Sequence, residues 1–340
     1  MRKIRIIFLT FALCFNAAWA GDFEDGDVAY AKKDYATALN KYRSAGTKGD
    51  VSAMHKLGGM YFGGEGVTKD INEAIRWYKL AAENGNLYSQ NTLGFFYAFG
   101  IGVPENPTEA VKWYKMAAAQ GNASAQYFLG GYYYDGRGVI QDYAEATRLY
   151  KMSALQGHAS AQYQLGLMYA NGKGVVKDYV ESVRWYKLAA AQGIVEAQYN
   201  LALKYDNGEG VLQDYAEALR WYKLAAAQGF VEAQFNLGYM YAEGQGVLQD
   251  YAEAMRWYKV AATKGFERAQ SNLGLMYFNG KGAVQNFVQA HMWFNLAAVK
   301  GEATAVKNRE LVASKMTPQQ IAEAQKLARE CQARDFKNCD

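Results

Sequence analysis

A glycine recurs every 36 residues along this chain, without insertion or deletion. The series consists of Gly49, Gly85, Gly121, Gly157, Gly193, Gly229, Gly265 and Gly301. A Leu-Gly pair and a Trp-Tyr pair keep the same spacing, as at Leu93-Gly94 and Trp113-Tyr114. Self-similarity at a period between about 20 and 50 residues is typical of solenoids, propellers and other repeat arrays. The sequence therefore predicts an array of small structural units.

The spacing within one repeat predicts two helices. In its first half, Ala197, Leu201 and Tyr205 follow at intervals of four residues, which places them on one helical stripe. In its second half, Leu219, Tyr222 and Ala226 follow at intervals of three and four residues, which also places them on one helical stripe. The period-two alternation of a strand is absent, and this excludes a propeller.

Each repeat also carries its own start and stop signals. The second helix is predicted to begin at an acidic or amide residue, namely Asp70, Asn106, Asp142, Asp178, Asp214, Asp250 or Asn286. Three residues further on stands Glu73, Glu109, Glu145, Glu181, Glu217, Glu253 or Gln289, which is the spacing of a capping box. The periodic glycine is expected to end this helix in the left-handed conformation. A Gly-x-Gly-Val stretch, such as 208–211, is expected to reverse the chain and turn its valine toward the core.

One helical pair is too small to bury its own apolar stripe, so the repeats are expected to stack into a continuous core. The predicted organisation is a leader at 1–20, a degenerate N-terminal capping pair at 21–49, seven repeats at 50–301, and C-terminal capping helices with a tail at 302–340. In the last segment Thr317, Pro318 and Gln320 have the spacing of an N-cap, a first helical position and an N3 residue.

The first twenty residues have the features of a secretory signal peptide. Arg2, Lys3 and Arg5 form a positive start. An apolar run over 6–15 follows, and small residues precede a predicted cleavage site after Ala20. The run is shorter than the roughly 20 residues of a membrane span, so no transmembrane segment is expected after cleavage. We therefore expect a periplasmic or secreted protein.

The charge balance gives no indication of a nucleic-acid partner. The formal net charge is +4, and the leader contributes three of these charges, which leaves +1 on the mature chain. A charge this small predicts no attraction to nucleic acid or to an anionic membrane surface.

Two cysteines, Cys331 and Cys339, lie in the C-terminal tail. In the oxidising compartment that a signal peptide implies, they are expected to form a short-loop disulfide. The pair lacks the CxxC spacing of a redox motif, so we expect it to staple the chain end.

The consensus of the repeat extends beyond glycine. In one repeat its positions are Ala197-Gln198, Leu201, Tyr205, Gly208, Gly210-Val211, Asp214, Ala218, Trp221-Tyr222, Ala225-Ala226 and Gly229. This pattern resembles the Sel1-like repeat, a relative of the tetratricopeptide repeat, and the resemblance covers 50–301 in seven units. It implies an all-α fold, a right-handed α-solenoid superhelix of tandem helix-turn-helix repeats. It also implies that the chain binds proteins or peptides.

One exported subgroup of that family is linked to β-lactam binding or hydrolysis and carries a disulfide in each repeat. Because none of the seven repeats here contains a cysteine, that activity is not expected to carry over.

Residues for chemistry are few. His55, His158 and His291 lie in different repeats and never in metal-ligand spacing, and no G-x-S-x-G elbow occurs. The recurring carboxylates are explained as helix caps. We therefore expect no catalytic, metal or cofactor site and predict that the chain is not an enzyme.

The resemblance places the variable positions of the first helices on a concave surface. The candidate partner-binding residues there are Tyr88, Phe95, Tyr127, Tyr163, Tyr199, Phe235 and Tyr239. Tyrosine offers a large contact area and a polar tip, which suits recognition. Packing of these rings between adjacent helices is the alternative. A run of amides, Gln164, Asn200, Asn236 and Asn272, either pairs with the backbone of an extended peptide or bridges neighbouring helices.

These features predict an exported scaffold for a protein or peptide of unknown identity. Two alternatives stay open: a peptidoglycan or carbohydrate binder, whose sugar rings would stack on the aromatic groove, and an envelope hydrolase of the β-lactam type, which would need a unique nucleophile and base.

Overall fold

The computed structural model describes residues 21–299, 303–336 and 339, and all regular secondary structure in these ranges is helical. The predicted signal peptide, with its cleavage site after Ala20, lies outside the described residues. Among the helices of the described ranges, none combines the length and the apolar character that crossing a membrane requires.

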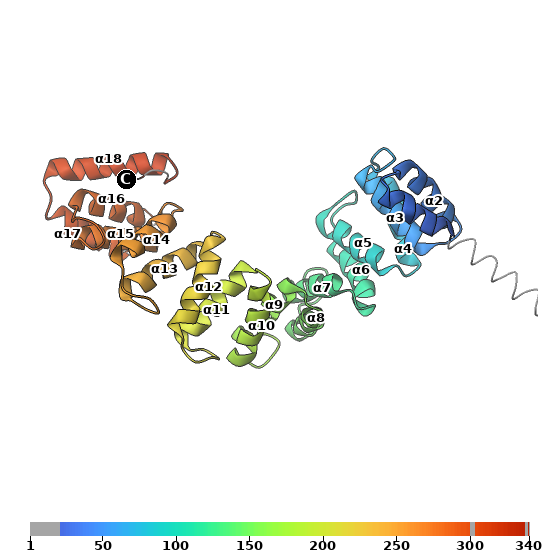
Figure 1. Ribbon diagram of the computed structural model, residues 1–340, viewed down its shortest axis with the longest axis horizontal. Helices are drawn as coiled ribbons and strands as arrows, with labels where there is room; N and C mark the ends of the chain where they lie inside the picture. The colour runs from blue at the N-terminus through green and yellow to red at the C-terminus, as the bar shows by residue number, and fades with distance from the viewer. Residues whose placement is uncertain (1–20, 300–302, 337–338, 340) are drawn as a thin grey trace, which may run out of the picture. The chain divides into compact units, whose positions relative to one another are not determined.

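Two helices alternate through each repeat (Figure 1). The first helices are α3 (Val51–Gly63), α5 (Leu87–Phe99), α7 (Ala123–Asp135), α9 (Ala159–Asn171), α11 (Val195–Asn207), α13 (Val231–Glu243) and α15 (Glu267–Asn279). The second helices are α4 (Ile71–Glu83), α6 (Pro107–Ala119), α8 (Tyr143–Leu155), α10 (Tyr179–Ala191), α12 (Tyr215–Ala227), α14 (Tyr251–Ala262) and α16 (Phe287–Ala298). Helix α2 (Tyr35–Thr47) precedes the repeats, and α17 (Ala303–Ala313) and α18 (Pro318–Ala333) follow them.

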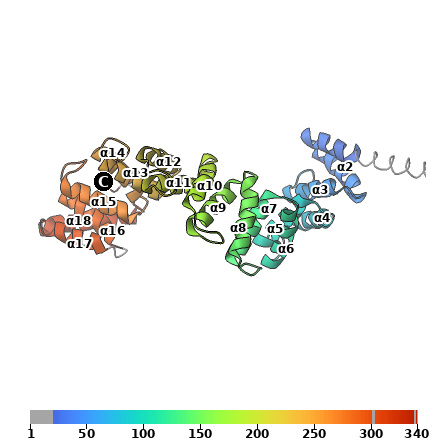
Figure 2. The same ribbon diagram turned by 90° about the horizontal axis from the view of Figure 1, so that it is seen from below.

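The chain forms two compact units. The described part of the first unit contains residues 21–168 and 172–176, and that of the second contains 169–171 and the residues from 177 onward. Within the first unit, α3 packs on α4, α5 on α6 and α7 on α8, and each pair contacts the next through its second helix. The second unit repeats this order from α10 to α16. At the C-terminal end of the second unit, α16, α17 and α18 lie together (Figure 2).

Aspartate or asparagine caps every second helix of the repeats, as the sequence predicts. In α12 the Asp214 carboxylate accepts hydrogen bonds from the backbone N–H groups of Ala216 at 2.9 Å and Glu217 at 3.0 Å. The capping box is not completed there, because the Glu217 side chain pairs with Arg220. The backbone N–H of Asp214 already donates to the carbonyl of Tyr205 on the preceding helix. The predicted box therefore lacks a free donor, and only half of it forms.

A complete capping box occurs at α18. The Thr317 side chain accepts from the backbone N–H of Gln320, and the Gln320 side chain accepts from the backbone N–H of Thr317. Pro318 occupies the first turn of this helix. The sequence prediction is confirmed at this position.

The turn between the two helices of a repeat requires glycine for two reasons, the positive φ of the backbone and the lack of space for a side chain. Gly208 ends α11 with a φ of +70°, and Gly210 follows with a φ of +75°. A Cβ on Gly210 would lie 2.3 Å from the carbonyl oxygen of Tyr179, at the start of α10. Glycine therefore allows this loop to touch the neighbouring repeat. Val211 is only partly buried, so the predicted turn of the valine toward the core is incomplete.

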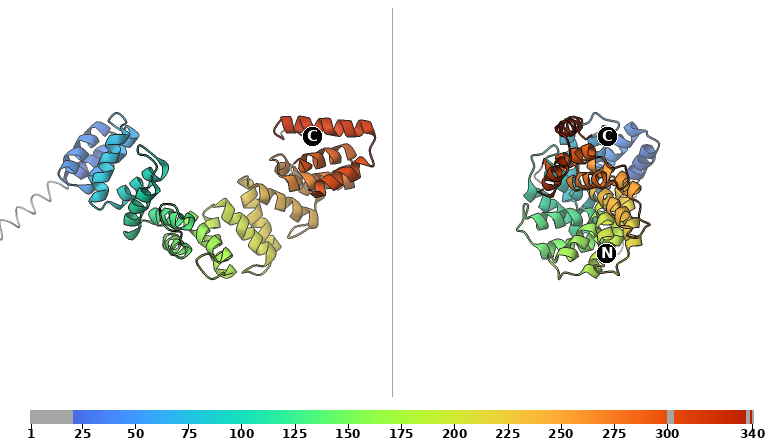
Figure 3. Two further views of the ribbon diagram at one scale, coloured as in Figure 1. Left: turned by 180° about the vertical axis from the view of Figure 1, so that it is seen from behind. Right: turned by 90° about the vertical axis from the view of Figure 1, so that its left-hand side faces the viewer.

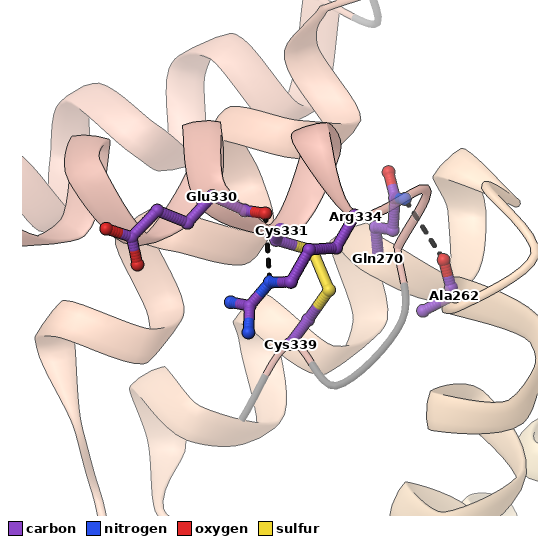
Figure 4. Close-up of a disulfide and its surroundings, with 6 residues drawn as sticks. All are labelled: Ala262, Gln270, Glu330, Cys331, Arg334 and Cys339. Atoms are coloured by element: carbon purple, nitrogen blue, oxygen red, sulfur yellow. Dashed lines mark hydrogen bonds between the residues drawn. A yellow bond between two sulfur atoms is a disulfide. The ribbon is translucent and has the colours of Figure 1, made fainter.

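The tail folds back onto the last repeats. Cys331, near the end of α18, is bonded to Cys339, and both side chains are buried (Figure 4). Phe336 lies between them in sequence and packs near Gly265, where a Cβ would stand 3.4 Å from its ring. In the left view of Figure 3, the red helix α18 runs alongside α16, with which it is in contact.

Candidate partner-binding surfaces

The seven candidate residues fall into three groups by exposure. Tyr88, Phe95 and Tyr239 are on the surface, with 60%, 38% and 44% of their area exposed. Tyr127, Tyr163 and Tyr199 are half-buried. Phe235 is buried, with 7% exposed, and belongs to the core cluster of the second unit.

Two of the half-buried rings, Tyr127 and Tyr199, pack against neighbouring helices. Tyr127 stacks on His158 with ring centroids 4.8 Å apart and lies 5.9 Å from Tyr150. Tyr199 lies 4.8 Å from Phe230 and 5.9 Å from Tyr222. Each ring thus sits between the second helix of its own repeat and the residue before the next first helix. Packing between helices, which is the alternative to a binding role for these residues, therefore buries much of the surface of the two rings.

Phe235 follows the same rule. Its ring lies 5.6 Å from Tyr258 and 5.3 Å from Phe266, and the guanidinium of Arg268 lies 4.7 Å from its centroid. Only an edge of Phe235 is available to a partner. A single groove through all the predicted rings stays a prediction, because Tyr127 and Tyr163 belong to the first unit and the later rings to the second.

The second unit has a cavity of about 540 Å³ on the face of its first helices. It is lined by Tyr199, Leu203, Asp206, Phe235, Asn236, Tyr239, Arg268, Ser271, Asn272, Leu275, Thr304 and Asn308. These residues come from α11, α13, α15 and α17. Tyr239 also lines a smaller adjoining cavity of about 240 Å³. Four helices of similar orientation therefore build one surface that combines rings, amides and a cation.

One carboxylic acid and one guanidinium, those of Asp206 and Arg268, lie in this cavity. Burial raises the pKa of the Asp206 carboxyl, and a hydrogen bond from the Tyr222 hydroxyl at 3.2 Å offsets part of that rise. Arg268 lies over the ring of Phe235. Arginine on an aromatic face keeps its donors free for a planar polar group.

The amide series bridges helices as well as facing the cavity. Burial raises the pKa of the Tyr258 hydroxyl, and a hydrogen bond with Asn272 lowers it in part. Asn236 makes the same kind of contact with Tyr222. Each of these two amides therefore fastens a first helix to the second helix of the preceding pair. Their cavity-lining atoms leave room for a role in binding.

The first unit has its own cavity of about 540 Å³. It is lined by Ala98, Phe99, Glu105, Tyr114, Tyr127, Phe128, Gly131, Tyr132, Tyr134, Asp135, Arg137, Tyr150 and Gln164. At its rim Arg137 and Glu105 form an ion pair of 3.0 Å, with both side chains about half exposed. Lys173 donates to the Tyr134 hydroxyl at 2.6 Å and covers its ring. Aromatic rings predominate in this cavity.

Sequence reasoning did not single out several residues of the first cavity. Phe99 stands where the other repeats have glycine, aspartate, asparagine or glutamate, and Phe128 interrupts a column of lysine, threonine, glutamine and asparagine. The signal was present as departures from the consensus. Phe128 stands in the column of the amides Gln164, Asn200, Asn236 and Asn272, and the column of Phe99 lies outside the candidate positions named above.

The histidines have structural surroundings. His55 Nδ1 lies 2.8 Å from the Ser89 hydroxyl, and His158 caps α9 by accepting from the backbone N–H of Ala161 at 3.3 Å. His291 is buried. In the described ranges, no group of three or more His, Cys, Asp or Glu side chains has an arrangement that could hold a metal ion.

Comparison with known proteins identifies one family and solved structures of similar repeat proteins. The family model described as Sel1 repeat matches residues 51–86, 87–122, 123–158, 159–194, 195–230, 231–266 and 267–301. The chain is similar to the crystal structure of c5321, a protective antigen present in uropathogenic Escherichia coli strains and displaying an SLR fold. The two are 32% identical, the match covers 94% of this chain and 78% of that one, and the TM-score is 0.66.

A Sel1 repeat protein from Oxalobacter formigenes is also similar. It is 34% identical, the match covers 71% of this chain and 96% of that chain, and the TM-score is 0.61. No curated protein matches the chain. The helical repeat fold expected from the sequence is confirmed by these comparisons.

Proposed function

Because the chain belongs to the Sel1 repeat family, we propose that it is an exported scaffold that binds a protein or peptide partner on the face of its first helices. The observation that carries this proposal is the cavity of about 540 Å³ in the second unit, built by three first helices and α17.

The residues of this cavity differ from repeat to repeat. The column of Tyr239 contains Leu203 and Leu275 in the neighbouring repeats, and the column of Arg268 contains Glu196 and Glu232. The consensus leucines, such as Leu237, are instead fully buried. The residues that recur in every repeat therefore form the core. The residues that differ between repeats lie on the exposed face and give it a surface chemistry suited to one partner.

The mixture of groups fits a peptide. Tyr239 and Leu275 provide exposed apolar area, Asn272 and Asn308 provide amides that can donate and accept, and Arg268 provides a cation. An extended peptide presents apolar side chains together with backbone N–H and C=O groups, which need such partners when they are buried.

Crosslinking capture from native envelope extract tests this proposal. The bait is the mature chain from Gly21 onward, compared with Tyr239→Ala and with Leu248→Ala as a matched control. Leu248 is 89% exposed and lines none of the cavities described above. A protein captured by the parent chain and by Leu248→Ala, but lost from Tyr239→Ala, would support binding at this cavity.

The same variants distinguish the rival function. A glycan-binding site would show a different result. The parent chain and Leu248→Ala would both bind purified peptidoglycan, Tyr239→Ala would not, and no captured protein would depend on Tyr239. Tyr239 is chosen for the substitution because it is 44% exposed, whereas Tyr199 packs against Tyr222 and Phe230 and its loss would also disturb the core.

Export is tested separately. The expected mature chain begins at Gly21, and intact-mass measurement on protein purified from the periplasm or the medium would show it. Recovery of the full-length chain from the cytoplasm alone would contradict export without affecting the binding test.

A further inference from the structure

One carboxylate in the cavity of the second unit has no counterpart in the other repeats. Asp206 lies near the end of α11 and lines this cavity. The equivalent positions carry residues that are uncharged at neutral pH, namely Phe62, Ala98, Tyr134, Ala170, Ala242 and Phe278. The repeat framework therefore forms without a charge at this position.

The hydroxyl of the buried Tyr222 does not require this charge. It donates to Asp206 at 3.2 Å, but it is also hydrogen-bonded to Asn236. In the next repeat, which has alanine in place of the aspartate, Tyr258 is hydrogen-bonded to Asn272. A neutral amide is therefore enough to satisfy a tyrosine at this position.

The first unit shows that even the amide is dispensable. Around Tyr114 the equivalent positions carry Ala98 and Phe128. The Tyr114 hydroxyl is buried and has no hydrogen-bond partner among the described residues. Support of a tyrosine hydroxyl therefore does not explain why the second unit has a carboxylate.

The Asp206 carboxylate is accessible from the cavity. The residue is partly exposed, and one of its oxygens, Oδ2, accepts the hydrogen bond from Tyr222. The other oxygen, Oδ1, makes no hydrogen bond to a described residue and is not buried. A ligand in the cavity can therefore reach one carboxylate oxygen directly.

No cation of the described chain compensates this charge. Burial raises the pKa of the Asp206 carboxyl, and the hydrogen bond from Tyr222 is what lowers it in part. A neighbouring cation would lower this pKa as well. Lys204 on the same helix pairs with Glu209, and Arg268 lies over the ring of Phe235. The carboxylate is thus partly desolvated without a counter-charge, which costs free energy.

The charges around the cavity leave it negative. The pKa of the Tyr199 hydroxyl is raised mainly by burial, further by Glu232 and Asp206, and it is lowered by Arg268. Two carboxylates and one guanidinium therefore act on a single ring of the cavity. A cationic partner complements this arrangement better than an anionic one.

The unpaired charge distinguishes between classes of ligand. A neutral sugar would donate a hydrogen bond to Oδ1, and an apolar side chain would donate none, but both would desolvate the carboxylate further without offsetting its charge. A cation offsets the charge and is also attracted to the faces of aromatic rings such as Tyr199 and Tyr239, which line the cavity.

The single open oxygen favours one kind of cation. A guanidinium pairs best with both oxygens of a carboxylate, and here Tyr222 already occupies one of them. An ammonium group is a compact charge that one oxygen can hold. The four-carbon stem of lysine is apolar and suits walls such as Leu203 and the two tyrosine rings.

We propose that Asp206 binds the ammonium group of a lysine side chain on the peptide partner, while the lysine stem lies against Leu203, Tyr199 and Tyr239. This inference rests on the proposed function, since it names the side chain that the partner presents to the cavity of the second unit.

The test is a ligand-observed NMR titration of the mature chain with N-acetyl-L-lysinamide and N-acetyl-L-norleucinamide. The two probes differ by the terminal ammonium group. One charge-assisted hydrogen bond in a partly exposed site predicts that the lysine probe binds about threefold to tenfold more tightly. In Asp206→Asn, which keeps an oxygen that can accept from Tyr222, this ratio is expected to fall to about one.

A matched control and a change of salt make the result specific. Glu217→Gln removes the same charge from α12, lines none of the cavities described above, and should keep the ratio of the parent chain. Higher ionic strength should lower the ratio in the parent chain, because it screens charges that are open to solvent. Circular dichroism on both variants shows whether the fold is retained.

Equal affinity of the parent chain for the two probes, no saturable binding of either, or a preference that survives in Asp206→Asn would each overturn the inference. Binding of N,N′-diacetylchitobiose that is lost in Asp206→Asn would overturn it in favour of a carbohydrate site. The proposed function is judged separately, by capture of a protein that depends on Tyr239. It stands if that capture succeeds while the titration shows no preference for the lysine probe.

Discussion

The ring of Tyr258 lies directly against the backbone of Gly238, so that a Cβ built at position 238 would stand 2.6 Å from its Cδ1 atom. The same contact recurs between Gly94 and Tyr114, at 2.6 Å. A first helix and a second helix therefore approach each other through a glycine, and the tyrosine ring fills the space that a side chain would take. This contact gives a physical reason for the Leu-Gly and Trp-Tyr pairs to recur with one period.

Substituting Gly238 with valine should lower the free energy of unfolding by about 1–3 kcal/mol, since two helices would have to separate around a ring that has no room to move. Gly238→Ala should have a smaller effect, because alanine favours the helix by about 1 kcal/mol. Ala202 already occupies this position opposite the buried Tyr222. Urea denaturation followed by circular dichroism measures the free energy of unfolding of both variants. A valine variant as stable as the parent chain would contradict the packing described.

Asp214 and Glu217 should differ in their effect on stability. Asp214→Ala removes the acceptor for two backbone N–H groups and should cost about 1 kcal/mol. Glu217→Ala removes only an exposed ion pair with Arg220 and should cost less than about 0.5 kcal/mol. If urea denaturation shows that both substitutions lower the free energy of unfolding equally, Glu217 takes part in capping, and the description of a half-formed capping box is wrong.

Loss of the disulfide should release the tail and leave the repeats intact. Cys331 and Cys339 are eight residues apart, and closing so short a loop stabilises the folded tail by about 2–3 kcal/mol in the chain-entropy model. In the Cys331→Ser, Cys339→Ser double variant, hydrogen exchange should speed up over α18 and remain unchanged over α11. The reductant dithiothreitol should reproduce the effect in the parent chain and do nothing further to the variant.

Acid should weaken the first repeat through His55. Burial lowers the pKa of His55 below its ordinary value of 6.5, so the folded state binds the proton less readily than the unfolded chain. The stability contributed by the neutral imidazole is therefore present above pH 6.5 and is lost as the pH falls below it. His55→Asn, which introduces the residue found at Asn91, should make the urea midpoint fall less between pH 7 and pH 5. An unchanged pH dependence would show that His55 has no part in it.

Much of the fold could be predicted because its determinants are local. Asp214 can cap a helix only by standing before it, and Gly210 can adopt a positive φ whatever surrounds it. Because the 36-residue unit recurs seven times, each of these local predictions applies to seven repeats. The failed half of the capping box had a non-local cause, since the N–H of Asp214 is taken by the Tyr205 carbonyl across the loop.

The binding surfaces were predicted less well, because exposure is decided by neighbours that are distant in sequence. Phe235 and Tyr239 are one helical turn apart on the same first helix, yet one is 7% exposed and the other 44%. The difference arises because Tyr258 and Phe266 cover Phe235. No spacing within α13 contains that information.

The sequence by itself determined the helical pair, its caps, its turns and the number of repeats, since each depends on residues within a few positions of one another. Only the tertiary structure decided which rings pack and which meet solvent, and that the Tyr114 hydroxyl lacks a partner while Tyr222 has one in Asp206. A hydroxyl is satisfied or unsatisfied according to what lies within about 3 Å of it. For Tyr114 the absent partner depends on two other helices, α5 and α7, that bring Ala98 and Phe128 to the same cavity.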